Sequence, residues 1–223
     1  MSGCPFHNNP TSNQMPSVME VLKVSTQALH DAAEGHRFQQ SLVKGEVSRE
    51  HYAAYLGQLF LVHRELESLL RGHTDKVPAI PAVVKAYQYQ EPYLLEDLRF
   101  YGVHPGSLTP LPATEALLGE VRERAAKDPL ALLGFHYVLE GSNNGNKFIA
   151  KALAKSFGLT GPEGLLYLDP YGDQQRPYWM AFKADMDAQG FNPAEMRVMA
   201  EAAQAMFQGI GAISAEMGAA VAA

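Results

Sequence analysis

The most telling stretch of the sequence is Lys23-Val-Ser-Thr-Gln-Ala-Leu-His30-Asp-Ala-Ala-Glu34-Gly-His-Arg-Phe38. Its apolar and small residues recur at helical spacing, which predicts a helix with His30 on a face of mostly small side chains. Thr26 and Ala33 lie one turn away on either side, which leaves room for a planar ligand. Glu34 is placed to join the outer shell of a metal held by the imidazole. A lone helical histidine is more often a packed or exposed residue than a ligand, so this hypothesis needs support elsewhere.

A second stretch, Glu140–Asn146, places two glycines inside a long apolar helix pattern. Gly141 and Gly145 share one helix face, and each costs about 1 kcal/mol relative to alanine in an exposed helix interior. Two explanations remain open: the glycines let a flat ligand approach the backbone, or they mark a close helix crossing or a kink. Polar side chains that could hydrogen-bond a ligand or an ordered water favour the first: Ser142, Asn143, Asn144 and Asn146.

The spacing of the histidines excludes other helical metal sites. A di-iron carboxylate bundle needs Glu-x-x-His pairs on two helices, and none of the eight histidines follows a glutamate by three residues. His-Glu-x-x-His, the signature of helical zinc proteases, is also absent from the sequence. These exclusions leave a redox cofactor with a single protein ligand as the remaining candidate, and haem is the commonest such group. The two stretches therefore predict a haem clamped between two helices.

The composition is that of an ordinary soluble globular protein. The 223 residues are 47% hydrophobic and 19% charged, and a net charge of −6 without a Lys/Arg run argues against nucleic acid or anionic membrane as the main partner. The single cysteine, Cys4, excludes an intramolecular disulfide and a cysteine-based zinc site, which fits a reducing compartment. We expect a cytoplasmic protein, since neither a secretory signal nor an apolar run of about 20 residues is found.

The predicted organisation is a flexible tail over residues 1–15 and one helical domain over residues 16–223. Ser17-Val-Met-Glu20 has the form of a capping box, so the helix that carries His30 should begin there. We expect further helices with no strand and no repeat at 38–43, 48–70, 79–101, 112–127, 129–157, 178–189 and 193–217, with a loop over 158–177. The fold class is all-α, a single-domain bundle of about eight helices.

Two stretches also carry a family resemblance. Between Lys23 and Glu67 the chain has Thr26-x-x-x-His30-x-x-Ala33-Glu34-x-x-x-Phe38, then Lys44-Gly45-x-Val47-Ser48-Arg49-Glu50 and Leu66-Glu67. On these residues, which need no gap, the chain resembles the haem oxygenase family, including its bacterial biliverdin-forming members. A weaker similarity covers Tyr137–Leu153, which looks like the family's glycine-rich distal helix. Elsewhere the likeness is mostly architectural.

The resemblance implies a haem oxygenase-like bundle with haem between a proximal helix and a glycine-kinked distal helix. His30 would be the proximal iron ligand, and Glu34 its neighbour. Gly141 and Gly145 would lie over the opposite face of the haem. Three further residues fall near family positions that contact the haem, two at its propionates and one in the pocket: Lys23, Lys183 and Phe207.

The implied activity is oxidative cleavage of haem b to biliverdin, carbon monoxide and ferrous iron. Haem would be both cofactor and substrate, O2 the oxidant, and a separate donor such as a ferredoxin or a reductase the source of electrons. If His30 is not the ligand, the other candidates are His36, His63 and His136.

Ser142 departs from the family pattern, because well-studied members carry an aspartate there that organises the distal water network. A serine holds a water but supplies no charge, so Asn143 and Asn144 would have to help order that network for catalysis. The main alternative is therefore a haem-binding or haem-sensing protein of the same fold that does not turn over.

Two other enzyme classes share the architecture. Thiamine-degrading enzymes depend on a cysteine nucleophile in the core, whereas Cys4 lies in the expected tail. A pyrroloquinoline-quinone synthase-like enzyme would have no affinity for haem. Cys4-Pro5-Phe6-His7 is similar to a short haem-regulatory motif, although a tail without function is the favoured interpretation.

Overall fold

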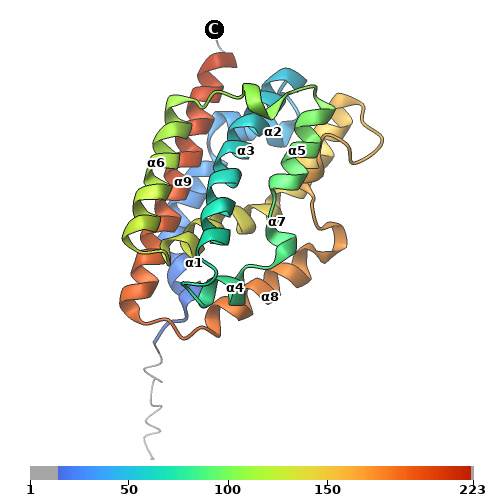
Figure 1. Ribbon diagram of the computed structural model, residues 1–223. Coiled ribbons are helices and arrows are strands. Elements are labelled where there is room, and N and C mark those ends of the chain that lie inside the picture. Colours follow the sequence, from blue (N-terminus) through green and yellow to red (C-terminus); the bar gives the residue numbers. More distant parts are fainter. Residues whose placement is uncertain (1–14, 222–223) are drawn as a thin grey trace, which may run out of the picture.

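The structure is a computed structural model that describes residues 15–221, and every regular element within that range is helical (Figure 1). The predicted tail up to residue 14, with Cys4 and Pro5, lies outside the described residues. Nine α-helices are found in the described range, joined by short 3-10 turns. They are α1 (Val18–Glu34), α2 (Arg37–Lys44), α3 (Arg49–Gly72), α4 (Ala79–Val83), α5 (Glu91–Phe100), α6 (Pro112–Lys127), α7 (Ala131–Phe157), α8 (Gln175–Asp187) and α9 (Pro193–Val221).

The helix carrying His30 begins where the capping box predicts. The Ser17 hydroxyl accepts a hydrogen bond from the Glu20 amide at 3.3 Å, and the Glu20 carboxylate accepts one from the Ser17 amide at 2.9 Å. These bonds satisfy amides that would otherwise have no partner in the first turn. The same device starts α9, where Asn192 Oδ1 accepts from the Glu195 amide and Glu195 Oε2 accepts from the Asn192 amide.

The predicted helix over 79–101 is wrong as a single element. It consists of α4, the 3-10 turn Ala86–Gln88 and α5. Val84 and Lys85 are extended, with ψ of 116° and 156°, and Pro92 sits in the first turn of α5, where its missing amide hydrogen costs nothing. The apolar period continues through this segment, so periodicity alone does not reveal the break.

Other boundaries shift by a few residues. The segment 158–177 contains two 3-10 turns, and α8 begins at Gln175 instead of Tyr178, with Pro177 accommodated in its first turn. The last helix extends to Val221. Helix α7 runs from Ala131 to Phe157, so Gly141 and Gly145 lie inside it, as predicted, and do not end it.

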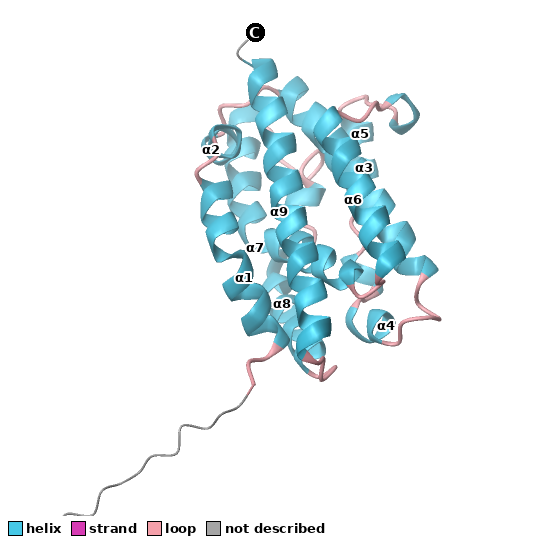
Figure 2. Cartoon of the chain, turned by 90° about the vertical axis from the view of Figure 1, so that its left-hand side faces the viewer, coloured by secondary structure: helices cyan, strands magenta, loops and turns pink. Residues whose placement is uncertain are grey.

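Helix α9 is the element around which the others are arranged. It packs against α1, α6 and α7, and Figure 2 shows it between α1 and α6. At Gly134 of α7, an added Cβ would lie only 2.0 Å from the Met199 carbonyl oxygen of α9, so the two helix backbones meet there. The close crossing that a glycine in α7 could mark is therefore at Gly134, and α9 sets the positions of both α1 and α7.

A buried carboxylate fixes the loop between α7 and α8. Asp97 of α5 is fully buried, and its two oxygens accept hydrogen bonds from the Leu166 amide at 2.9 Å and the Tyr167 amide at 2.8 Å. Burial raises the pKa of Asp97 to about 6, against the lowering effect of these amides. The contact holds the 3-10 turn Leu166–Leu168 against the bundle.

Among the described residues, no helix combines the length and the apolar character needed to cross a membrane.

We predict that Gly134→Ala destabilises the protein by about 2–4 kcal/mol, because the new methyl group would collide with backbone that cannot rotate away. The matched control is Gly119→Ala on the exposed face of α6, where an added Cβ has nothing within 4 Å. It should stabilise the protein by up to about 1 kcal/mol. Urea unfolding followed by circular dichroism measures both. Equal effects of the two changes would contradict the backbone contact.

Candidate functional site

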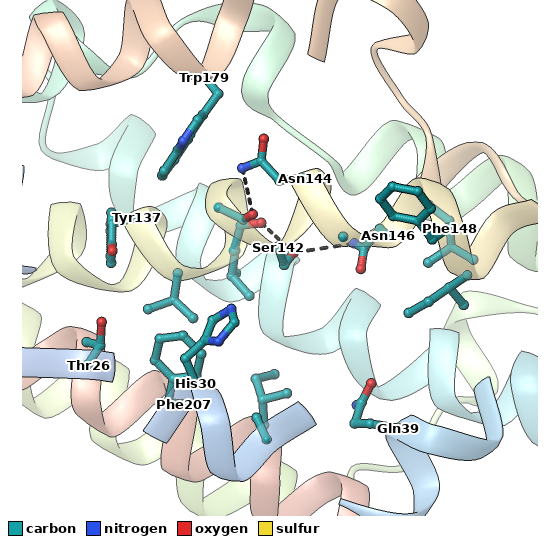
Figure 3. A pocket seen from close by; sticks show the side chains of 18 of the residues that line it. Thr26, His30, Gln39, Tyr137, Ser142, Asn144, Asn146, Phe148, Trp179 and Phe207 are labelled. Carbon is teal, nitrogen blue, oxygen red and sulfur yellow. Dashed lines mark hydrogen bonds between the residues drawn. The ribbon is translucent and has the colours of Figure 1, made fainter. Parts of the chain in front are cut away.

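A cavity of about 1530 Å³ lies between α1 and α7 and is bordered by parts of α2, α3, α8 and α9. It is larger than the roughly 300–1,000 Å³ of common small-molecule sites. Figure 3 shows side chains from α1 and α9 facing those of α7 and α8 across it. Apolar and aromatic groups line much of it, including Tyr137, Trp179 and Phe207.

His30 forms the α1 wall of this cavity. Its side chain is 52% exposed, and its ring packs edge-on against Phe207 of α9 with centroids 6.0 Å apart. Its Nδ1 lies 3.8 Å from an Asp31 carboxylate oxygen. Thr26 is buried and donates its hydroxyl to the Leu22 carbonyl at 2.7 Å. This bond holds the Thr26 side chain close to the helix backbone, one turn from His30. Phe207 contacts the imidazole of His30, and the ring is accessible from the cavity, so His30 is well placed to bind a metal centre.

The opposite wall is the glycine stretch of α7. Both Gly141 and Gly145 line the cavity. An added Cβ at Gly145 would meet nothing within 4 Å, whereas one at Gly141 would lie 3.3 Å from the Trp179 indole of α8. Neither glycine meets another helix backbone, so a helix crossing does not explain this pair. Gly145 instead leaves the α7 backbone uncovered where it lines the cavity, and Gly141 leaves room for the Trp179 indole.

Polar side chains between the glycines divide between two sides of α7. Ser142 and Asn144 line the cavity, together with Asn146. Ser142 Oγ donates to the Leu139 carbonyl at 2.7 Å, and Asn144 Nδ2 donates to the Gly141 carbonyl at 2.9 Å. Asn143 does not join them, since it is buried away from the cavity lining with its amide 3.5 Å from the Glu140 carboxylate.

The remaining predicted residues lie around the same cavity. Lys23 of α1 and Lys183 of α8 line it, so two cationic side chains face it from different helices. Ala33 and Phe207 also contribute to the lining. Glu34 is the last residue of α1, and its side chain is outside the described part of the structure.

The other candidate histidines are placed differently from His30. His63 and His136 are buried and do not line the cavity. Burial lowers the pKa of His136 to about 4, which keeps that ring neutral. His36 lines the cavity, but its Nδ1 accepts the Phe38 amide at 3.3 Å and caps α2. Within the described chain, these positions favour His30 as the ligand.

A buried polar cluster lies behind α7, and sequence reasoning missed it. Tyr171 donates its hydroxyl to Glu140 Oε2 at 2.9 Å and accepts from Gln90 Nε2 at 2.7 Å. Burial raises the pKa of Glu140 to about 7, although Tyr171 and Asn143 hydrogen bonds oppose the shift. Among the described residues, Glu140 Oε1 and Asn143 Oδ1 have no protein partner, and such buried atoms commonly bind ordered water. No motif could reveal this cluster, because Gln90 and Tyr171 come from irregular segments.

Comparison with known proteins agrees with this arrangement. The family model described as heme oxygenase matches residues 17–216. The chain belongs to the haem oxygenase family. Its match includes the helix of His30, the glycine stretch and most of α9.

Individual relatives have low sequence identity to this chain, but their alignments cover most of its length. The chain is 25% identical to heme oxygenase 1 of Pongo abelii over 204 residues, which cover 89% of this chain and 71% of that protein. Among solved structures, it is similar to the haem oxygenase of Leptospira interrogans, with a TM-score of 0.83, 23% identity and coverage of 90% and 100%. Haem oxygenase-1 of Synechocystis sp. PCC 6803, solved in complex with haem, gives a TM-score of 0.83 at 20% identity, with coverage of 93% and 96%. The all-helical fold is thus the haem oxygenase fold.

We predict that Glu140→Gln reduces the loss of stability that accompanies a rise in pH from 5 to 8. The folded-state pKa near 7 exceeds the ordinary 4.5, so the folded protein binds the extra proton and stability falls as the pH rises from 4.5 through 7. Between pH 5 and pH 8 the wild type should lose about 2 kcal/mol more than Glu140→Gln. Urea titrations at the two pH values measure this difference. Glu123→Gln, at an exposed position of α6, is the control and should behave as wild type.

Proposed function

We propose that this chain is a haem oxygenase that cleaves haem b to biliverdin, carbon monoxide and ferrous iron, using O2 and electrons from a separate donor. The observation that carries the proposal is the pairing of His30 with the glycine stretch of α7 across one large cavity. The Synechocystis relative solved in complex with haem has the same fold.

The residues around the cavity fit a haem. His30 offers an imidazole that is 52% exposed, and Gly145 leaves open space where a side chain would otherwise stand. Phe207 and Trp179 supply apolar surface for a macrocycle. Lys23 and Lys183 supply positive charge for carboxylate groups such as propionates.

The roles of these residues follow from their positions. A bound haem supplies the iron that activates O2 and the ring that is oxidised. His30 would bind that iron as neutral imidazole, and Glu34 follows it by one turn of α1. The α7 backbone at Gly141 and Gly145 would lie close over the opposite face, which limits the directions that a small ligand can take. Ser142 and Asn144 would hold ordered water there through their hydroxyl and amide groups.

We place the reaction in the cytoplasm, with residues 16–223 as a single domain. The low cysteine content supports a reducing compartment, and the electron donor would be a ferredoxin or a reductase. A second candidate is a haem-binding or haem-sensing protein that does not turn over, because Ser142 carries no charge at the place of the family's aspartate. Purified protein with haem and an ascorbate or ferredoxin system separates the two, since only an oxygenase consumes the Soret band.

We predict that His30→Ala abolishes the spectrum of histidine-ligated haem while the helix content stays unchanged. The reason is that the other cavity histidine, His36, is engaged in capping α2. Absorbance and circular dichroism provide the two measurements. His104→Ala, at an exposed position away from the cavity, is the control and should retain the spectrum. A His30→Ala protein with the wild-type spectrum would move the ligand to His36, His63 or His136.

We predict that Ser142→Asp changes the turnover rate or the biliverdin isomer but leaves the haem dissociation constant within about threefold. The added carboxylate would reorganise water on the far side of the cavity from His30, where it cannot affect iron ligation directly. Product chromatography after a single turnover and haem titration measure the two quantities. Unchanged rate and unchanged isomer together would show that residue 142 does not control the distal water.

A further inference from the structure

The chain contains a single tryptophan, Trp179, and this residue lines the cavity. Its indole projects from α8 toward α7 and lies 3.3 Å from the position of an added Cβ at Gly141 (Figure 3). The ring is tilted against Tyr137, with centroids 6.0 Å apart, and stacks on Phe182 at 5.4 Å. An indole can lose an electron before it loses a proton. A one-electron oxidant in the cavity would therefore act readily on Trp179.

A cluster of three tyrosines adjoins Trp179. Tyr178, the preceding residue of α8, stacks on Tyr87 with ring centroids 4.0 Å apart and an angle of 22°. The Tyr171 ring lies edge-on to both, 5.3 Å from Tyr178 and 5.8 Å from Tyr87. Tyr87 and Tyr178 are half-buried, whereas Tyr171 is 7% exposed. Because consecutive Cα atoms are only about 3.8 Å apart, the three-tyrosine cluster meets the cavity wall at Tyr178 and Trp179.

Tyr171 has a base for its phenol proton. The hydroxyl donates to Glu140 Oε2 at 2.9 Å, and Glu140 precedes Gly141 on α7. Burial, and then the Glu140 charge, raises the pKa of the Tyr171 phenol well above its ordinary value, so the phenol does not ionise by itself. Oxidation changes this, because a phenol that has lost an electron is a strong acid. Its proton can then pass to the carboxylate along the existing hydrogen bond.

We propose that Trp179, Tyr178 and Tyr171 form a one-electron relay that carries oxidising equivalents out of the cavity, with Glu140 as the proton acceptor. The inference rests on the proposed haem oxygenase function, in which hydrogen peroxide reacting with bound ferric haem supplies the oxidant. The relay lies on the outer side of the cavity wall and uses the contacts between α7, α8 and the segments of Tyr87 and Tyr171.

Each step of the relay moves one electron. The oxidant takes an electron from Trp179 and is thereby reduced by one equivalent. Trp179 regains an electron from Tyr178, and Tyr178 regains one from Tyr171. Tyr171 loses its phenol proton to the Glu140 carboxylate, so the net products are a neutral tyrosyl radical and a protonated carboxyl group. A reductant of the ascorbate class, acting at partly exposed Tyr87, returns the electron, and Glu140 returns the proton.

The relay keeps oxidation away from the residues that would bind the haem. A radical left on Trp179 lies against Tyr137 and Gly141, which both line the cavity. A radical on Tyr171 is buried outside the cavity lining, next to a base and in ring contact with Tyr87. Proton transfer to Glu140 gives the relay its direction, because it stabilises the radical at Tyr171.

Pulse radiolysis of the haem-free protein tests the relay, since the single tryptophan gives one defined starting point. Azide radicals oxidise Trp179, and the indole radical should then decay at the same first-order rate at which a phenoxyl radical appears. Tyr171→Phe removes one oxygen atom, keeps the ring, and should slow this transfer at least about tenfold. Tyr178→Phe, at a half-buried position, should slow it as well. Deuterated solvent should slow the wild type, because the phenol proton moves to Glu140.

Tyr101→Phe is the matched control, because Tyr101 also has a buried hydroxyl but contacts the rings of Tyr52 and Phe100. It should transfer at the wild-type rate. A wild-type rate in Tyr171→Phe would overturn the relay, as would loss of the phenoxyl signal in Tyr137→Phe alone, which would leave the radical in the cavity. An equal rate in deuterated and ordinary water would overturn the role of Glu140.

Haem-loaded protein separates failure of the relay from failure of the proposed function. With ferric haem and hydrogen peroxide, freeze-quench electron paramagnetic resonance should show a tyrosyl radical in the wild type that Tyr171→Phe lacks. If radiolysis shows the transfer but the loaded wild type forms no tyrosyl radical, the haem does not feed the relay and the inference is overturned. Failure of the proposed function has a different signature: the wild type retains its Soret band with an ascorbate or ferredoxin system, whatever the radiolysis shows.

Discussion

The backbone contact between α7 and α9 at Gly134 and Met199 is the constraint on which the rest of the structure depends. Helix α9 also packs along α1, so both walls of the cavity rest on one common element. The separation between His30 on α1 and the glycine stretch on α7 is therefore set by packing against α9. A side chain at position 134 would push α7 outward and change the height of the cavity two turns farther along the helix.

Three buried carboxylates connect the regular helices to irregular segments of the bundle. Asp97 holds the turn of Tyr167, Glu67 accepts amides at the start of α5, and Glu140 accepts from Tyr171. Burying a carboxylate is costly unless hydrogen bonds compensate it, and each of these has at least one close donor. These irregular segments are thus attached by directional polar contacts, while apolar packing holds the helices together.

Much of the fold follows from local signals. The capping boxes at Ser17 and Asn192 place the starts of α1 and α9, because their side chains satisfy specific amides within one turn. The break within residues 79–101 escapes such reasoning, since extended backbone at Val84 depends on how the segment packs against the bundle. Periodicity reports which residues are apolar, and it does not report whether the chain stays helical between them.

The residues of the site also differ in whether the sequence alone can predict them. His30 and the glycine pair can be predicted because their residue types are unusual on helix faces. Asn143 lies away from the cavity because successive residues on a helix are about 100° apart, which turns its side chain toward Glu140. Tyr167 and His63 are 104 positions apart, and only the tertiary structure brings them together. Long-range polar pairs of this kind leave no trace in a single sequence.

The exposure of His30 affects the order in which the protein folds and binds a ligand. Because the ring faces an open cavity whose walls are held by α9, the helices do not need a ligand to cover an otherwise buried apolar surface. Under the proposed function, folding and haem loading can then be separate events, and a ring-opened product would leave through the same opening without unfolding the chain. A haem oxygenase that destroys its haem in each catalytic cycle would need this independence.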